Sequence, residues 1–406
     1  IREDTMLLPY LTLFVALLHV LFAPKSVKAI PLHLNFTEII QFYGYPVEEH
    51  HVQTSDSYIL TIFRIPHGRN QSPSHGRPVV FLQHGFVDCS FTWIANNPTE
   101  SLAFILADAG FDVFLGNSRG NKFSLASTKF PVDSDAFWKF SWDQMAEYDL
   151  PACVDYVKSH TGASKIGYVG HSQGTSIMFA ALASISGFGN SLNSVVQLAP
   201  VGRVYHTPND FLKFIGAIHL GELLSLIGER EFLANSKILD ILFPEVCAVD
   251  PDACNSVLEF VCGKSHDVNK TRLPFITAHE PGGTSVMDGE HWAQSVRSDH
   301  FQYYDYGAEE NKKKYGTPTT PIYDLQAMPK GETSTNKFPM FLVSGGQDEL
   351  ADPVDVKWLL QDLRKNTKLE ISHLYEPSYA HLDFVWGVNA HTKIYPEVVK
   401  FLVANK

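Results

Sequence analysis

The sequence has 406 residues, of which 45% are hydrophobic and 12% aromatic, and its formal net charge at pH 7 is -12. This hydrophobic content supports a large core and excludes an intrinsically disordered chain, while the acidic balance and the lack of a basic stripe exclude a nucleic-acid-binding surface. Because the length exceeds the usual size of one compact domain, we expect a core domain that carries an insertion.

Residues 1–29 have the pattern of a secretory signal peptide. We expect Met6 to be the initiator, and the apolar run Leu7–Ala23 follows it directly. Val27 and Ala29 occupy the small-residue positions that signal peptidase reads, so cleavage is expected near Ala29. A membrane anchor is the alternative, but the run is short for a span and is interrupted by proline and histidine. The sequence has no second long apolar stretch, so we expect no transmembrane segment in the mature chain.

The five cysteines of a secreted chain leave at least one unpaired. Cys89 and Cys153 lie near predicted core elements and are expected to be buried thiols. Among the clustered Cys247, Cys254 and Cys262, we expect a bridge between Cys247 and Cys254, which would close a short loop. No cysteine or histidine spacing indicates a metal site, and no cofactor is expected.

Three Asn-x-Ser/Thr sequons, at Asn35, Asn70 and Asn269, are candidate N-glycosylation sites. Such sites fit a chain that enters the secretory pathway.

Short apolar runs alternate with helical stretches in two parts of the chain, which predicts a mostly parallel central sheet flanked by helices on both faces. The expected strands are Tyr58–Ile65, Pro78–Gln83, Phe111–Leu115, Lys165–Val169, Ser194–Leu198, Phe338–Val343 and Leu369–Leu374. The expected helices are Ser101–Ala109, Ser141–His160, Thr175–Ile185, Val354–Leu363 and a closing helix over Thr392–Val403.

A G-x-S-x-G motif, Gly170-His171-Ser172-Gln173-Gly174, lies between an expected strand and an expected helix. This turn is too tight for side chains at its flanks, which explains the two glycines. Its strained backbone lifts the Ser172 hydroxyl clear of the sheet, at the positive end of the helix that follows. Ser172 is therefore the predicted nucleophile of a serine hydrolase. We expect the turn to hold the His171 side chain elsewhere, without a role in proton transfer.

The alternation of strands and helices stops within residues 202–336. Phe211–Ile227 is predicted to be a helix with a wide apolar stripe, Ile238–Phe243 is again apolar, and no strand pattern is visible. We interpret residues 202–336 as a mainly helical cap that overhangs Ser172, and a helical subdomain buried for stability alone is the alternative. The cap would divide the core domain into residues 30–201 and 337–406.

A serine hydroxyl is a weak nucleophile until a base removes its proton, and that base needs an acid to orient it. In the α/β-hydrolase arrangement the acid and then the histidine follow the serine along the chain, each after a sheet strand. Asp348 follows the strand that begins at Phe338, and His381 follows the last strand, so these two are the predicted acid and base.

Other acids and bases lie close to these positions. Asp352 and Asp355 are rival acids, although Asp352 has the position of a helix N-cap and Asp355 falls on the next helix. His373 and His391 are the alternative bases.

Acyl transfer by a serine hydrolase also needs N–H donors for the oxyanion of the tetrahedral intermediate. The backbone N–H of Gln173, directly after the nucleophile, is one candidate. The second is the N–H of Phe86 in His84-Gly85-Phe86, after the strand Pro78–Gln83, where Gly85 lets the backbone approach closely.

Motifs spread over the chain carry a family resemblance. They include Tyr43-Gly44-Tyr45-Pro46, Leu115-Gly116-Asn117-Ser118-Arg119-Gly120, Phe140-Ser141-Trp142-Asp143, Gly170–Gly174, Gly283-Thr284-Ser285-Val286, His291-Trp292 and His381–Gly387. In these motifs the chain resembles the acid lipases, the gastric and lysosomal acid lipase group of the α/β-hydrolases.

The resemblance implies a catalytic triad of Ser172, Asp348 and His381, with Phe86 and Gln173 as the oxyanion hole. It also implies a cap with a mobile lid, a disulfide between Cys247 and Cys254 with Cys262 free, and acylglycerol or cholesteryl ester substrates.

We therefore expect a lipase that hydrolyses triacylglycerols or cholesteryl esters through an acyl-enzyme at a lipid–water interface, outside the cell or in a lysosome or vacuole. A carboxylesterase for smaller soluble esters is one alternative, and a non-catalytic lipid-binding protein of the same fold is another. A peptidase is the weakest alternative, because nothing in the sequence supplies a pocket for a charged peptide. The sequence makes no prediction of oligomeric state.

Overall fold

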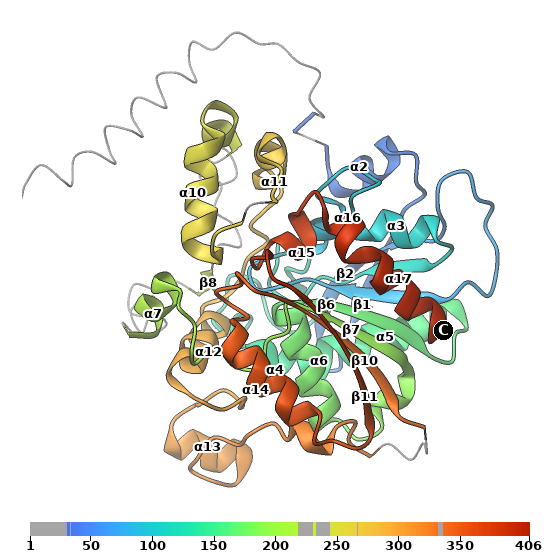
Figure 1. Ribbon diagram of the computed structural model, residues 1–406. Helices are drawn as coiled ribbons and strands as arrows, with labels where there is room; N and C mark the ends of the chain where they lie inside the picture. Colours follow the sequence, from blue (N-terminus) through green and yellow to red (C-terminus); the bar gives the residue numbers. More distant parts are fainter. Residues whose placement is uncertain (1–30, 33, 218–229, 233–243, 266, 332–335) are drawn as a thin grey trace, which may run out of the picture.

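The computed structural model describes residues 31–32, 34–217, 230–232, 244–265, 267–331 and 336–406. One large sheet runs through it (Figure 1), with the strand order β1-β2-β4-β3-β6-β7-β10-β11, and β5 pairs with β2. Its strands are β1 (Glu48–Gln53), β2 (Tyr58–Ile65), β3 (Val79–Gln83), β4 (Asp112–Leu115), β5 (Ala126–Ser127), β6 (Ile166–His171), β7 (Leu192–Leu198), β10 (Phe338–Gly345) and β11 (Leu369–Glu376). The predicted signal peptide over residues 1–29 lies outside the described residues.

The six strands from β4 to β11 in this order pair in parallel, and only the edge formed by β1, β2 and β5 is antiparallel. Every residue of β3 and β6 is buried, as continuous apolar strands covered on both faces should be. This arrangement confirms the predicted α/β fold with a mostly parallel sheet. The strand β1 was not predicted, because only Val52 of its six residues is fully buried and its sequence has no apolar alternation.

Helices cover both faces of the sheet. Two successive residues of β6, which face opposite sides of the sheet, show this. The Tyr168 hydroxyl donates a hydrogen bond to Gly174 O in α6 on one face, and a Cβ at Gly167 would contact Leu402 of α17 on the other. In Figure 1 the helices α3, α15, α16 and α17 lie above the sheet, and α6 and α14 lie below it. The helices of the core are α2 (Phe36–Phe42), α3 (Leu102–Asp108), α4 (Trp142–Gln144), α5 (Leu150–Thr161), α6 (Gln173–Ser184), α14 (Pro353–Leu363), α15 (Asp383–Trp386), α16 (Ala390–Lys393) and α17 (Tyr395–Ala404).

Two expected helices are interrupted in the structure, and each interruption precedes a proline. The predicted helix Ser141–His160 consists of α4, a π-helical turn over Met145–Asp149, and α5, which has Pro151 in its first turn. The predicted closing helix is divided into α16 and α17, and Pro396 lies in the first turn of α17. Proline has no N–H for the bond to the preceding turn, so the regular helix breaks there.

The segment interpreted as a cap is mainly helical, but it contains one short strand pair that the sequence did not predict. The strands β8 (Glu231–Phe232) and β9 (Thr284–Ser285) are antiparallel. Two-residue strands are too short to produce an alternating pattern in the sequence, so the expectation of no strand in this segment was wrong. The helices here are α7 (Asp210–Ala217), α10 (Pro251–Cys262), α11 (Leu273–Thr277), α12 (Val286–Arg297) and α13 (Ala308–Tyr315).

Part of this segment cannot be compared with its prediction. The expected helix Phe211–Ile227 is described as far as Ala217, and the apolar run Ile238–Phe243 lies outside the described residues. Within the part of the chain that is described, no helix is both long and apolar enough to span a bilayer.

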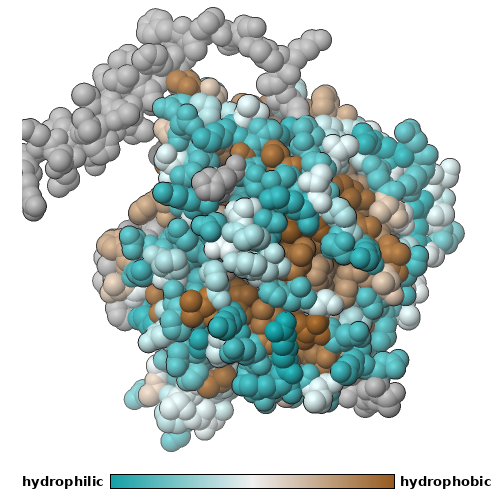
Figure 2. Space-filling model, viewed as in Figure 1, coloured by the Kyte–Doolittle hydropathy of each residue, from teal (hydrophilic) through white to brown (hydrophobic). Residues whose placement is uncertain are grey.

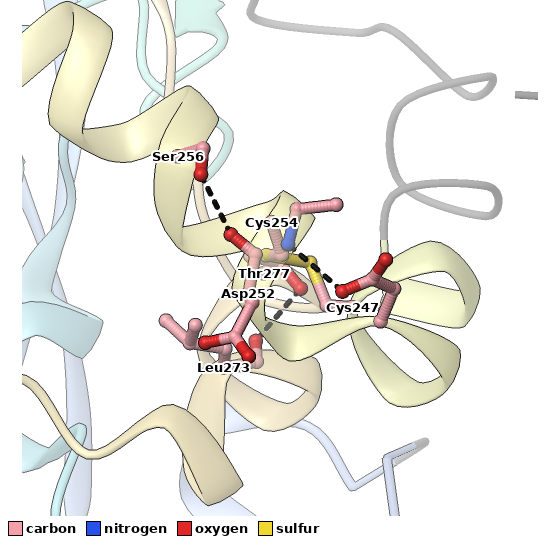
Figure 3. The surroundings of a disulfide bond; sticks show 8 residues. Cys247, Asp252, Cys254, Ser256, Leu273 and Thr277 are labelled. Carbon is pink, nitrogen blue, oxygen red and sulfur yellow. Dashed lines mark hydrogen bonds between the residues drawn. A yellow bond between two sulfur atoms is a disulfide. The ribbon is translucent and has the colours of Figure 1, made fainter. Parts of the chain in front are cut away.

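A disulfide joins Cys247 to Cys254 near the N-terminal end of α10 (Figure 3). Both cysteines are buried against Leu273 of α11 in a small apolar cluster of their own. The remaining cysteines are free, with Cys89 and Cys153 buried as expected and Cys262 half-buried. The bridge therefore ties the start of α10 to the cluster that α11 completes.

Hydrophilic residues cover most of the face shown in Figure 2, and hydrophobic ones form patches toward its middle. Large apolar side chains are also exposed on two helices of the segment interpreted as a cap. Phe214 of α7 is 60% exposed, and Val257 of α10 is 50% exposed. The cap segment thus presents apolar side chains to solvent.

Candidate active site

Three side chains from separate loops meet at the carboxyl edge of the parallel strands. Ser172 follows β6, Asp348 follows β10 and His381 follows β11. The Ser172 Oγ lies 2.7 Å from His381 Nε2, and His381 Nδ1 lies 3.0 Å from both carboxylate oxygens of Asp348. All three side chains are buried. The structure therefore brings together the predicted nucleophile, base and acid in one chain of hydrogen bonds.

The backbone at Ser172 is strained, with φ 53° and ψ −121°. Such a conformation is costly for a residue with a side chain and occurs mainly where function requires it. The flanking glycines are sterically required, because a Cβ at Gly174 would lie 2.5 Å from Gln83 O and one at Gly170 would lie 2.8 Å from the Gly174 carbonyl carbon. The sharp turn between β6 and α6 therefore presents the Ser172 hydroxyl at the sheet edge.

The Asp348 carboxylate is oriented by its own loop. Its Oδ1 accepts hydrogen bonds from the N–H groups of Leu350 at 2.9 Å and Ala351 at 2.8 Å. The two rival acids have other partners: Asp352 caps α14, as predicted, and Asp355 accepts hydrogen bonds from Arg203 and His206. Asp348 is thus the only one of the three that contacts His381.

The alternative bases are also engaged away from Ser172. His373 is hydrogen-bonded to Ser344 Oγ at 2.8 Å, and His391 Nδ1–H donates to the Val388 carbonyl at 2.6 Å. Neither contacts the serine.

His171 is closer to the site than the sequence indicated. Its Nε2–H donates a hydrogen bond of 3.0 Å to the His381 carbonyl, and the two rings lie 5.1 Å apart. Burial, and then the neighbouring His381, lower the pKa of His171 to about 3, so its ring is neutral. The expectation that this side chain points elsewhere was wrong, because the turn directs it toward the His381 backbone, whose carbonyl accepts its hydrogen bond.

The candidate oxyanion donors lie on two backbone segments that closely approach Ser172. A Cβ at Gly85 would lie 3.1 Å from Ser172 Cβ, closer than most side-chain contacts, so glycine lets this loop approach Ser172 without displacing it. Gln173 is the first residue of α6, where backbone N–H groups have no acceptor within the helix. Both segments can therefore offer N–H groups to an oxyanion bound at Ser172.

His84 fixes the direction of the Phe86 N–H. Its Nε2 accepts a hydrogen bond from the Ser118 backbone N–H at 3.0 Å, so Nδ1 carries the proton and donates to the Gly85 carbonyl at 2.8 Å. Burial lowers the pKa of His84 and keeps the ring neutral. The Gly85 carbonyl and the Phe86 N–H belong to one planar trans peptide and point in opposite directions. Holding the carbonyl therefore orients the N–H.

One group of residues in the described part of the chain has the donor set of a metal site, and it lies at the antiparallel edge of the sheet. It consists of Glu48, His50 and His160. The Arg64 guanidinium donates hydrogen bonds to Glu48 Oε2 at 2.8 Å and to His160 Nε2 at 3.2 Å. The positively charged Arg64 side chain therefore already binds two of the atoms that a metal ion would need as ligands. This group has no contact with Ser172 and takes no part in the site.

The three sequons lie on the surface of the described structure. Asn35 and Asn70 are exposed, and Asn269 is half-buried. The Asn269 side chain accepts hydrogen bonds from the N–H and hydroxyl of Thr271, the third residue of its own sequon.

Comparisons with known proteins agree with the fold. Residues 78–387 match the model of the alpha/beta hydrolase fold, and residues 36–97 match that of the partial alpha/beta-hydrolase lipase region. The chain is 41% identical to gastric triacylglycerol lipase of Rattus norvegicus, over 91% of this chain and 92% of the relative. It is 39% identical to lysosomal acid lipase/cholesteryl ester hydrolase of Homo sapiens, over 91% of both chains.

Among solved structures, the complex of DcsB with its substrate analogue is similar in fold, with a TM-score of 0.54 at 14% identity, over 89% of this chain and 100% of that chain. Identity this low supports the fold alone. The matches to gastric and lysosomal enzymes, which cover at least 91% of each chain, are more specific. The chain therefore belongs to the acid lipase family, the gastric and lysosomal lipases of the α/β-hydrolase fold.

Proposed function

We propose that this lipase hydrolyses the carboxylic ester bonds of neutral lipids, triacylglycerols or cholesteryl esters, through an acyl-enzyme formed on Ser172. The observation that carries the proposal is the 2.7 Å contact between Ser172 Oγ and His381 Nε2, continued by the contact between His381 Nδ1 and Asp348. The names of the gastric and lysosomal relatives support the two substrate classes.

Acylation begins when His381 Nε2 accepts the Ser172 proton and the serine oxygen attacks the ester carbonyl carbon. The carbonyl electron pair moves onto its oxygen, and the N–H groups of Phe86 and Gln173 bind the resulting oxyanion. His381 then gives the proton to the departing alcohol oxygen as the ester C–O bond breaks. Asp348 holds the imidazole in the required tautomer and stabilises its protonated form.

Deacylation repeats this sequence with water as the nucleophile. His381 accepts a proton from water, and the water oxygen attacks the acyl carbon. The bond to Ser172 Oγ then breaks, the proton returns to that oxygen, and the fatty acid is released.

We infer that residues 202–336 form a cap between two parts of the hydrolase core, residues 30–201 and 337–406. The exposed apolar side chains of Phe214 and Val257 support contact of this cap with a lipid–water interface. A route through the secretory pathway, to the cell exterior or a lysosome, is supported by the family and by the sequons at Asn35, Asn70 and Asn269.

Replacing Ser172 by Ala tests the nucleophile. We expect hydrolysis of triolein and cholesteryl oleate to fall by at least about a thousandfold and covalent labelling by an organophosphate to disappear. Ser176→Ala is the matched control, because Ser176 lies on α6, the helix that directly follows Ser172, with its hydroxyl bonded to the Val201 carbonyl, and this variant should remain active. Substantial hydrolysis by Ser172→Ala would contradict the proposal.

The wild-type substrate panel separates the alternatives. Cleavage of short soluble esters but neither long-chain lipid would indicate a carboxylesterase. Lipid binding without organophosphate labelling or turnover would indicate a non-catalytic protein.

A further inference from the structure

One cap side chain, Trp292 of α12, contacts both residues that we assign to the oxyanion hole. The Trp292 indole N–H donates a hydrogen bond to the side-chain Oε1 of Gln173. Its ring also lies edge-on to the Phe86 ring, with the centroids 6.3 Å apart. The proposed mechanism uses only the backbone N–H groups of Gln173 and Phe86, so these side-chain contacts have no role in it so far.

The Gln173 side chain is held at both ends of its amide. While Oε1 accepts from Trp292, Nε2 lies 3.4 Å from Met145 Sδ, and the residue is almost completely buried. Gln173 directly follows the nucleophile and begins α6. A fixed side chain at this position restrains the backbone whose N–H faces the developing charge.

The loop that carries Phe86 also rests on the cap segment. The Phe86 ring stacks on Phe232 of β8 at 5.9 Å. The N–H groups of Gly282 and Gly283 donate to the Val87 carbonyl at 2.7 and 3.2 Å. Since β9 joins Gly283 directly to α12, these contacts belong to the same cap structure that positions Trp292.

The helix α12 is itself anchored to the core. Asp288 accepts a hydrogen bond of 2.8 Å from the Trp142 backbone N–H, and His291 stacks on the Trp142 ring with centroids 4.0 Å apart. Trp292 therefore projects from a rigid support, which a positioning residue requires.

We propose that Trp292 is a positioning residue for the oxyanion hole. It aligns Gln173 and Phe86, and the geometry of their N–H donors therefore depends on the cap. The inference rests on the proposed function, because it presupposes that an oxyanion forms at Ser172. A misaligned donor weakens binding of the transition state more than binding of the substrate, so the effect belongs in kcat.

Trp292→Phe tests this role, since it keeps an aromatic ring and removes the indole N–H. On a soluble short-chain ester, we expect kcat per organophosphate-titrated site to fall about tenfold and KM to change less than about twofold. A trifluoromethyl ketone, which adds to the serine and places an oxyanion in the hole, should bind more weakly by the same factor. Trp138→Phe is the matched control, because it removes an indole N–H bonded to the Val132 carbonyl at 2.7 Å, and it should change neither value.

Gln173→Met removes the acceptor of the same hydrogen bond and should cause a similar loss, with the double variant no slower than the slower single one. Three results would overturn the inference. The first is that the losses in kcat of the two single variants add in the double variant, and the second is that Trp292→Phe leaves kcat and ketone affinity unchanged. The third is that only the number of titratable sites falls. Activity in Ser172→Ala would instead overturn the proposed function, so the two failures are distinguishable.

Discussion

Asp348 and Asp352 are close in the sequence but have separate tasks, which allows a sharp test of the triad. In Asp348→Asn, the amide group cannot serve as the same acceptor for His381 Nδ1–H, so the tautomer with its proton toward Ser172 is favoured. We expect kcat on a soluble ester to fall by about four orders of magnitude with the fold intact. In Asp352→Asn, the N-cap of α14 is preserved, because asparagine caps as well as aspartate, and activity should be unchanged. A kcat for Asp348→Asn above about a tenth of the wild-type value would exclude Asp348 as the acid.

At the level of single residues, the sequence predicted the side chains whose position follows from the strand order. Ser172, Asp348 and His381 each follow a strand that could be recognised from its apolar run. The roles proposed for His84 and Trp292 depend on contacts with Ser118 and Gln173 in distant segments, and no local pattern encodes such contacts. The histidine before Gly85 and the His291-Trp292 motif were visible in the sequence, but only the fold assigns their partners.

The disulfide is the element-scale feature most accessible to experiment. It joins residues separated by 7 positions, and the chain-entropy model gives a loop of this size a stabilisation of about 2.5 kcal/mol. Replacing both Cys247 and Cys254 by Ser should therefore reduce hydrogen-exchange protection of α10 by an amount of this order, while protection of β6 is retained. Cys262→Ser, which alters a free cysteine on the same helix, is the control and should have little effect. Equal protection of α10 in both variants would show that apolar contacts with Leu273 alone hold this helix.

Regular elements were predicted well where one physical signal dominates. The buried parallel strands β3 and β6 are continuous apolar runs, and their predicted bounds differ from the observed ones by at most two residues at either end. The prediction failed where signals compete. In Ser141–His160 the apolar periodicity continues past Pro151, but the missing N–H changes the local helix type. The edge strand β1 is held by backbone pairing with β2, which leaves no apolar pattern in its own sequence.

At the scale of the whole molecule, two buried carboxylates join residues 202–336, the proposed cap segment, to the proposed hydrolase core. Asp143 of α4 accepts hydrogen bonds from the Tyr323 hydroxyl at 2.7 Å and from the Tyr304 N–H at 2.8 Å. Asp288 of α12 accepts from the Trp142 N–H at 2.8 Å. Burial is the main cause that raises the pKa of each carboxyl to about 7. Their ionisation therefore places negative charge inside the junction between the cap segment and the core.

These raised pKa values give the fold a specific dependence on pH. A carboxyl whose folded pKa exceeds its unfolded value contributes stability that is complete below the unfolded value and is lost as the pH rises through about 7. Burial has the opposite effect on the pKa values of His171 and His291, which it lowers to about 3. The stability that these neutral histidines contribute is therefore lost as the pH falls below the pKa of histidine in the unfolded chain. Together these groups favour maximum stability at mildly acidic pH.

Asp143→Asn isolates one term of this balance, because the amide stays uncharged at every pH. Urea denaturation of the wild type should show that the free energy of unfolding falls by about 1 kcal/mol per buried carboxyl between about pH 6 and about pH 8. In Asp143→Asn, this fall in the free energy of unfolding should be smaller by about the same amount. Asp210→Asn, which changes an exposed aspartate on α7, is the control and should follow the wild-type pH dependence. If Asp143→Asn followed it as well, the Asp143 carboxyl would already be ionised throughout this range, and its burial would not make the junction sensitive to pH.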